Sequence, residues 1–137
     1  MHVALIQTSA SNSLQKNLEK TTSFVKDAAD QGAELVCLQE CLPHGFSRSV
    51  WEIDLRAHAI ANGYYVAGVN RVGTELESEY YGASLFVDPI GEVIAQADDK
   101  ETVLVVDLPR ERIDEVRRVW PFFRDRRPDA YDAIIAP

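Results

Sequence analysis

Two short apolar runs near the amino terminus constrain the fold more than any other feature of this sequence. They are His2–Gln7 (HVALIQ) and Leu35–Gln39, and each has the length and composition of a buried strand. The segment between them has apolar residues at helical spacing. Asn12 and Gln15 have the spacing of a capping box, and Gly32 stands where a C-cap glycine belongs. This order predicts a βαβ unit with parallel strands and a right-handed crossover.

The remaining sequence predicts two more helices and several further strands. Ser49 and Glu52 have the spacing of a capping box and predict a helix that ends at Asn62-Gly63, and Pro109 is suited to begin a short helix. Pro89-Ile90-Gly91 is a tight-turn composition that joins two strands as a hairpin. The predicted strands are 64–69, 80–88, 92–97 and 102–108. The fold class is therefore α/β, and the antiparallel hairpin argues against a purely doubly wound parallel sheet.

Size and composition indicate one ordinary soluble domain. The chain has 137 residues, of which 46% are hydrophobic and 26% charged, which excludes a mainly disordered or low-complexity chain. Its net charge of -8 argues against a nucleic-acid or anionic-membrane partner. Two cysteines cannot form a disulfide scaffold and fit a reducing, cytoplasmic compartment. We expect no signal peptide, no membrane span and no internal repeat.

Arginines are concentrated near the carboxyl end. Residues 110–127 hold seven arginines against four acidic residues, so this segment has a charge of +3 and the remainder -11. The simpler interpretation is a helix and loop that pair with acidic groups elsewhere in the fold or in a partner subunit. The alternative is an anion or carboxylate site. From Pro121 onward the sequence predicts an extended tail.

One carboxylate stands at the position where open α/β sheets place their active sites. Glu40 directly follows the predicted buried strand Leu35–Gln39, and ligands bind beyond the carboxyl ends of parallel strands. Glu40 is therefore the first candidate for a general base, with an ordinary surface glutamate as the alternative.

The amino-acid sequence around Glu40 resembles that of a known enzyme family. "QGAELVCLQE" (31–40), after "ALIQ" and "NLEK", resembles the amino-terminal part of the nitrilase superfamily of carbon–nitrogen hydrolases. Three later stretches resemble its N-carbamoylputrescine amidase and β-ureidopropionase-like branch. They are "HAIANGYYVAGVNRVG" (58–73), "YYGASLFVDPIGEVIAQA" (80–97) and "RIDEVRRVWPFFRDRRPDAY" (112–131).

This resemblance implies an αββα sandwich that assembles as a dimer or larger oligomer. It also implies hydrolysis of small amide or N-carbamoyl substrates by a glutamate, lysine and cysteine triad, with no metal or organic cofactor. Glu40 matches the glutamate, the general base that activates the thiol. The family's lysine stabilises the oxyanion of the tetrahedral intermediate.

The sequence departs from the family pattern in its centre. Family members are about twice as long, and the "YRK"-like stretch with the lysine and the "CWD"-like stretch with the nucleophile are both absent. The sequence continues from Glu40 to the next predicted helix without the family's central segment, as though residues between Phe46 and Trp51 had been removed. We therefore expect one shortened domain over 1–137, in which 1–46 matches the amino-terminal part of the family and 51–137 its carboxyl-terminal part.

An incomplete triad leaves two functions open. The first is an amidase by ancestry, inactive as the isolated chain. The second is a non-catalytic α/β module that self-associates. Removal of central strands leaves open sheet edges and apolar surface, which predicts a homo-oligomer in either case.

Other residues are weaker candidates for chemistry. Cys37 is interpreted as a small core residue. Cys41 adjoins Glu40, but neighbouring strand side chains point to opposite faces, which argues against Cys41 as a relocated nucleophile. Together with His44 the two cysteines form C-x₃-C-x₂-H, which lacks a second ligand pair for zinc. His58 is expected to be hydrogen-bonded and partly buried. The lysines are interpreted as solvated charges, and they are Lys16, Lys20, Lys26 and Lys100.

Several polar and aromatic residues have a structural and a functional interpretation. Asn70-Arg71 either pairs structurally or helps to bind a carboxylate. Tyr80 and Tyr81 are expected in core and sheet-edge packing or at a pocket wall. Trp51 and Trp120 are interpreted as core or interface aromatics.

Overall fold

The computed structural model describes residues 1–39, 47–75 and 78–130. Within these ranges the helices are α1 (Leu14–Asp30), α2 (Arg48–Asn62), α3 (Arg110–Val119) and the 3₁₀ helix η1 (Pro128–Ala130). The strands are β1 (His2–Gln7), β2 (Leu35–Leu38), β3 (Val66–Gly68), β4 (Val72–Glu75), β5 (Ser78–Tyr81), β6 (Leu85–Val87), β7 (Val93–Gln96) and β8 (Thr102–Asp107).

The first sheet has the order β2-β1-β8 and confirms the predicted βαβ unit. β1 and β2 are parallel, with Val3 opposite Leu35 and Ile6 opposite Leu38. β8 pairs antiparallel with the other edge of β1. Because β1 and β2 run in the same direction, their carboxyl ends lie at the same edge of the sheet.

The second sheet has the order β3-β6-β7, and a separate hairpin is formed by β4 and β5. β6 and β7 form the predicted antiparallel hairpin, and β3 pairs antiparallel with β6. The mixed topology confirms that this is not a purely parallel sheet.

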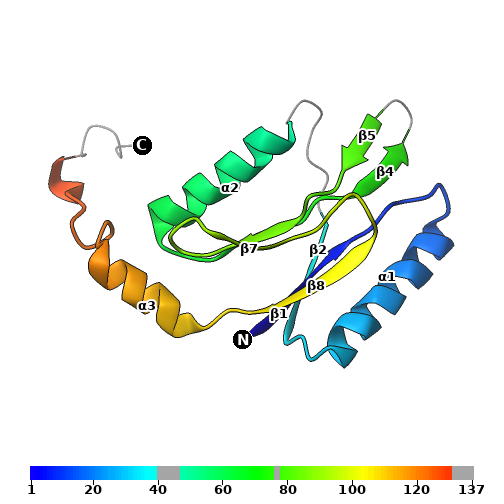
Figure 1. Cartoon of the computed structure of the whole chain (residues 1–137), viewed down its shortest axis with the longest axis horizontal. Helices are drawn as coiled ribbons and strands as arrows, with labels where there is room; N and C mark the ends of the chain where they lie inside the picture. Colours follow the sequence, from blue (N-terminus) through cyan, green and yellow to red (C-terminus); the bar gives the residue numbers. More distant parts are fainter. Residues whose placement is uncertain (40–46, 76–77, 131–137) are drawn as a thin grey trace.

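The two sheets stack between two helices, which gives four layers (Figure 1). Between the sheets, Val3 and Leu5 of β1 pack against Phe86 of β6. The outer face of the first sheet packs on α1, and the outer face of the second packs on α2. This is the αββα order that the sequence resemblance implied.

Two of the three predicted helix starts are displaced by one or two residues. The N-cap of α1 is Ser13, which accepts a hydrogen bond from the backbone N–H of Lys16, rather than Asn12. The N-cap of α2 is Ser47, which accepts from the N–H of Val50, rather than Ser49. In both cases a neighbouring polar side chain of equal capping ability takes the position. Gly32 follows α1 with a left-handed φ of 86°, as expected.

The predicted strand 80–88 is wrong as one element. It is divided into the end of β5 and all of β6, because Gly82 (φ 66°) and Ala83 (φ 56°) adopt left-handed conformations between them. The prediction also missed β4, which pairs with β5.

The arginine-rich segment projects from the sandwich at the end opposite α1 (Figure 1). Arg112 pairs with Asp88 at 3.4 Å, and Arg117 donates to the carbonyl of Gly63 at the end of α2. The Arg112–Asp88 ion pair confirms the predicted pairing with an acidic group elsewhere in the fold for that arginine, and Arg117 contacts a backbone carbonyl instead. The prediction of an extended tail from Pro121 onward is wrong at Pro128–Ala130, which form the 3₁₀ helix η1.

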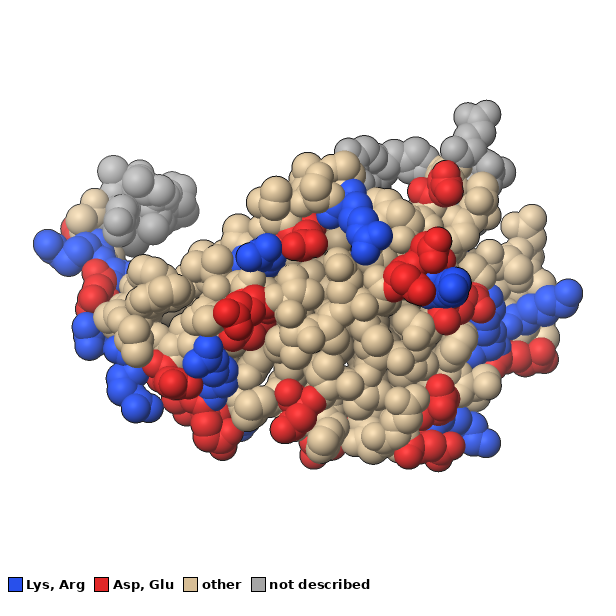
Figure 2. Space-filling model, in the orientation of Figure 1, with Lys and Arg blue, Asp and Glu red and all other residues tan. Residues whose placement is uncertain are grey.

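Figure 2 shows charged residues mainly around the rim of one face, with uncharged residues across its centre.

Candidate functional site

Buried polar residues gather at the carboxyl end of β1. Six polar or charged residues are buried in the described part of the chain, and Asp88 is the one that lies elsewhere. The other five are Gln7, Thr8, Asn70, Arg71 and Ser84. Burying a polar side chain costs free energy unless it is hydrogen-bonded. These five residues are therefore expected to form a hydrogen-bond network at this edge of the sandwich.

Gln7 is the centre of this network. Its side chain is fully buried, and its amide nitrogen donates to the backbone carbonyls of Asp98 and Lys100 at 2.9 and 2.7 Å. Its amide oxygen accepts from the backbone N–H and the hydroxyl of Ser84 at 3.0 and 2.7 Å. One side chain therefore joins β1, the start of β6 and the loop before β8.

The network continues into the segment that follows β3. The backbone N–H of Asn70 donates to the hydroxyl oxygen of Ser84, and the Asn70 side-chain amide donates to the carbonyl of Gly82. Ala83 is held in its left-handed conformation from both sides. Its N–H donates to the carbonyl of Asp98, and its carbonyl accepts from the indole N–H of Trp51. Trp51 is thus a core residue, as predicted.

The Arg71 side chain is buried in the same region. Arg71 is 3% exposed, and its guanidinium carbon lies 4.2 Å from the centre of the Tyr80 ring. This cation–π contact favours the structural interpretation of Arg71. Tyr81 points to the other side and packs against the cluster under α2.

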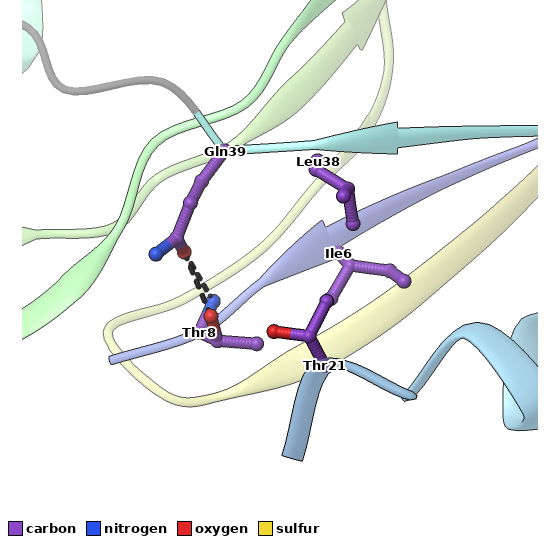
Figure 3. A pocket seen from close by; sticks show the side chains of 5 residues that line it. All are labelled: Ile6, Thr8, Thr21, Leu38 and Gln39. Atoms are coloured by element: carbon purple, nitrogen blue, oxygen red, sulfur yellow. Dashed lines mark hydrogen bonds between the residues drawn. The ribbon is translucent and has the colours of Figure 1, made fainter. Parts of the chain in front are cut away.

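A small pocket opens beside this network, between α1 and the carboxyl ends of β1 and β2 (Figure 3). It has a volume of about 170 Å³ and is lined by Ile6, Thr8, Thr21, Leu38 and Gln39. The amide oxygen of Gln39 accepts two hydrogen bonds from Thr8, at 2.8 Å from the N–H and 3.0 Å from the hydroxyl. These bonds fix the residue that directly precedes Glu40. The walls offer hydroxyl and amide groups, which can orient a neutral polar molecule but cannot remove a proton at neutral pH.

Three predicted site residues lie outside the described residues, and they are Glu40, Cys41 and His44. Cys37 is described and is half-buried among the residues between the sheets. Its packing against this cluster agrees with the interpretation as a core residue. Burial raises the pKa of its thiol, which disfavours the thiolate that a nucleophile requires.

Lys20 is not a solvated charge, and that prediction is wrong. Its ammonium lies 2.6 Å from Glu101 and also donates to the hydroxyl and carbonyl of Ser9. The cluster ties α1 to the end of β1 and to the residue before β8. The other three lysines, Lys16, Lys26 and Lys100, are exposed as predicted.

The Glu101 cluster makes stability depend on pH. Burial raises the pKa of Glu101, but hydrogen bonds from Lys20 and Ser9 outweigh it and hold the pKa below its ordinary value of 4.5. A lowered pKa in the folded state means that the carboxylate stabilises the fold above 4.5 and that this contribution disappears as pH falls through the folded-state pKa. We expect Glu101→Gln to be less stable than the parent at pH 7. Urea unfolding measured over a range of pH should show that the free energies of unfolding of the parent and of Glu101→Gln converge in acid. A difference in free energy that stays constant with pH would contradict this prediction.

Two other residues differ from their predicted surroundings. His58 is exposed, with a side-chain exposure of 61%, and its contact is the Asp54 carboxylate one helical turn earlier at 3.8 Å. The prediction of a partly buried histidine is therefore wrong, because the His58 side chain extends from α2 into solvent. Trp120 is 42% exposed, so it is not a core residue.

Sequence reasoning missed the residues that organise this edge, namely Gln7, Thr8, Gln39 and Ser84. A signal was present, since a glutamine at the end of an apolar run is an unusual strand residue whose amide needs partners when buried.

Among the residues that the structure describes, no group of three or more potential metal ligands comes together. In the same part of the chain, no helix is long and apolar enough to cross a bilayer.

Comparison with known proteins places this fold in a family. The sequence model of the carbon–nitrogen hydrolases matches residues 42–118. N-carbamoylputrescine amidase from Arabidopsis thaliana is 40% identical over 98 residues, which are 65% of this chain and 33% of that protein. Citrullinase from Francisella tularensis is 35% identical over 69% of this chain and 35% of its own length. The chain thus spans about a third of the curated relatives that it matches.

Solved structures agree with the sequence comparison. A carbon–nitrogen hydrolase from Helicobacter pylori G27 superposes with a TM-score of 0.61 at 35% identity, covering 83% of this chain and 45% of that protein. An amidase of the nitrilase superfamily from Nesterenkonia AN1 gives a TM-score of 0.55 at 31% identity, over 82% of this chain and 39% of that protein. The family model matches more than half of the residues of this chain, and these solved structures share its fold over more than four fifths of its length. The chain therefore belongs to the carbon–nitrogen hydrolase family.

Proposed function

We propose that this chain carries the general-base part of an amidase site for N-carbamoyl amines or amino acids, with Glu40 as the base. The observation that carries the proposal is the position of Gln39. Its side chain is tied to Thr8 at the carboxyl end of β1, where the buried polar network and the pocket also lie. Glu40 follows Gln39 directly, at the edge of the sheet where α/β proteins place reactive groups.

The relatives support the substrate class. Four of the similar curated proteins are N-carbamoylputrescine amidases from plants, at 37 to 40% identity. In the proposed reaction, for which this chain lacks the family's own thiol and lysine stretches, the carboxylate of Glu40 accepts the thiol proton while the sulfur bonds to the carbamoyl carbon. The C–N bond then breaks as the departing nitrogen takes up that proton, and water hydrolyses the resulting thioester-like intermediate and restores the thiol. A lysine stabilises the oxyanion that forms. We propose that residues 1–46 and 51–137 act as one shortened domain, in the cytoplasm, without metal or organic cofactor.

The isolated chain is expected to release no ammonia above background from N-carbamoylputrescine or N-carbamoyl-β-alanine. Its sequence lacks the family's lysine and cysteine stretches, and loss of one oxyanion donor alone costs about 10² to 10³ in turnover. Ammonia release by the purified protein measures this directly. Turnover that disappears in both Glu40→Gln and Cys41→Ser would contradict the prediction and identify Cys41 as a nucleophile.

A chimera tests the role of Glu40. The segment of the Arabidopsis thaliana N-carbamoylputrescine amidase that lies between its matches to Phe46 and Trp51 is inserted at that point of this chain. The chimera is expected to hydrolyse N-carbamoylputrescine and to lose this activity in Glu40→Gln. Activity that survives Glu40→Gln would overturn the assignment of the base.

A second candidate, a non-catalytic self-associating module, is favoured by the exposure of β2. Leu35 and Leu38 are 49% and 52% exposed, and β2 pairs with β1 along one edge. A short apolar edge strand without a charged residue is a surface that favours association. We therefore propose a homo-oligomer under both candidate functions.

A further inference from the structure

A second pocket lies at the other end of β1 from Gln39 and the buried polar network. Its volume is about 260 Å³, and its walls come from β1, β2 and β3, from the residues before β3 and from the start of α3. Figure 1 shows that the amino terminus lies beside the connection from β8 to α3, which closes this end of the sandwich. The pocket has no lining residue in common with the pocket beside Gln39.

The walls of this pocket are mainly apolar. Val3 and Cys37 line it from the first sheet, Ala67 from the second, and Leu108 and Ile113 from the end of the sandwich. At about 30 Å³ for each group of the size of a water molecule, its volume has room for a chain of roughly eight carbon atoms. Water in such a space finds few hydrogen-bond partners, so an apolar group that displaces it is favoured.

Hydrogen bonds hold the walls in position. The backbone N–H of Leu108 donates to the carbonyl of Met1 at 2.9 Å, which joins the end of β8 to the start of β1. The hydroxyl of Tyr65, a further wall residue, donates to the carbonyl of Pro109 at 3.2 Å and so ties the segment before β3 to the start of α3. A cavity whose walls are fixed before binding loses little entropy when it takes up a ligand.

Arg110 is the charged side chain among the described residues that line this pocket. Two other arginines of α3 are occupied, since Arg112 pairs with Asp88 and Arg117 donates to the carbonyl of Gly63. Within the described part of the chain, the guanidinium of Arg110 has no ion-pair partner. It is therefore available to a ligand that reaches the rim of the pocket.

The acidic residues at this end of the first sheet do not compensate the charge of Arg110. Glu34 and Asp107 lie 3.9 and 3.1 Å from the terminal ammonium of Met1 and balance that charge instead. An apolar cavity with one positive group at its rim is complementary to a molecule that is apolar at one end and negative at the other. A guanidinium binds a carboxylate through two parallel hydrogen bonds, which favours a carboxylate as the negative group.

We propose that this pocket binds a small apolar carboxylate, with a hydrocarbon body of roughly eight carbon atoms between the two sheets and its carboxylate on Arg110. Because the body lies against Val3, Cys37 and Ile113, the carboxylate stays at the rim, where Arg110 is exposed. The site goes beyond the proposed amidase function and does not depend on Glu40 or on any triad residue.

Calorimetric titration of the whole chain with octanoate and with octan-1-ol tests the proposal. Octanoate is expected to bind with a dissociation constant on the order of 0.1 mM. Octan-1-ol, which has the same chain without the charge, is expected to bind roughly 5-fold more weakly, and Arg110→Gln is expected to remove this difference. Arg118→Gln is the matched control, since Arg118 is an exposed residue of α3 that is not among the lining residues. Absence of octanoate binding, equal affinity of the parent for both ligands, or equal effects of the two variants would overturn the proposal.

Alkylation of Cys37 by iodoacetamide tests where octanoate binds. Bound octanoate is expected to slow alkylation at Cys37, located by tandem mass spectrometry, because the thiol lines the pocket. Ala67→Leu fills the pocket and is expected to abolish both binding and protection, whereas Ala57→Leu, at an exposed position of α2, is the matched control. Circular dichroism checks that each variant is folded. Octanoate binding that leaves Cys37 unprotected, or that is unchanged in Ala67→Leu, would overturn the proposal. Ammonia release by the chimera tests the enzymatic proposal separately, so the two proposals can fail independently.

Discussion

Replacement of Gln7 by leucine is expected to destabilise the fold by about 2–4 kcal/mol. The substitution keeps the size of the side chain but removes both donors and the acceptor of a fully buried amide. The backbone N–H of Ser84 and the carbonyl of Lys100 then lose their partner, and each buried group left unsatisfied costs about 1–3 kcal/mol. Asp98 keeps a second hydrogen bond, from the N–H of Ala83, which limits the loss.

Urea unfolding of Gln7→Leu measures this cost, and Gln96→Leu is the matched control. Gln96 is an exposed residue of β7, so the same chemical change there is expected to shift stability by less than about 0.5 kcal/mol. Equal effects at the two positions would show that the Gln7 network contributes nothing specific. A fall in the slope of the unfolding curve would instead report a change in the compactness of one of the two states.

The parts of the fold that were predicted correctly depend on local signals. The βαβ unit follows from two apolar runs and the helical spacing between them, and the parallel register of β1 and β2 agrees with it. The displaced helix starts show the limit of this reasoning. Ser13 and Ser47 each stand close to another good capping residue, so the local sequence contains two equivalent starts.

The features that were missed depend on residues far apart in the chain. Lys20 looks like a surface charge until Glu101, 81 positions away, is brought beside it. The break after β5 likewise depends on Gln7, whose amide packs where a longer strand would place a side chain at residue 82. For the candidate site, the βαβ pattern correctly predicted that β1 and β2 are parallel, so that their carboxyl ends lie at one edge of the sheet. The polar network that organises this edge could not be predicted, because its hydrogen bonds join β1, β6 and the loop before β8.

Gly82→Ala is expected to cost about 3 kcal/mol or more, because the position is closed to any side chain. An added Cβ would lie 2.6 Å from both the Asp98 carbonyl oxygen and the Gln7 amide nitrogen, and 2.7 Å from Val72. Two of these neighbours belong to the buried network and cannot move without breaking it, so the strain adds to the penalty for a φ of 66°.

Gly32→Ala separates the two causes of this cost. Gly32 has a φ of 86°, but an added Cβ there has no atom within 4 Å, so conformational strain alone applies. Its expected cost is about 1–2 kcal/mol. If thermal and urea unfolding give the two variants the same loss, backbone conformation explains both, and the close packing of Gly82 against Gln7 makes no contribution. A larger loss at Gly82 would show that close packing adds to the conformational strain there, since the carbonyl of Asp98 and the amide of Gln7 must stay in place for the buried network at the carboxyl end of β1 to form.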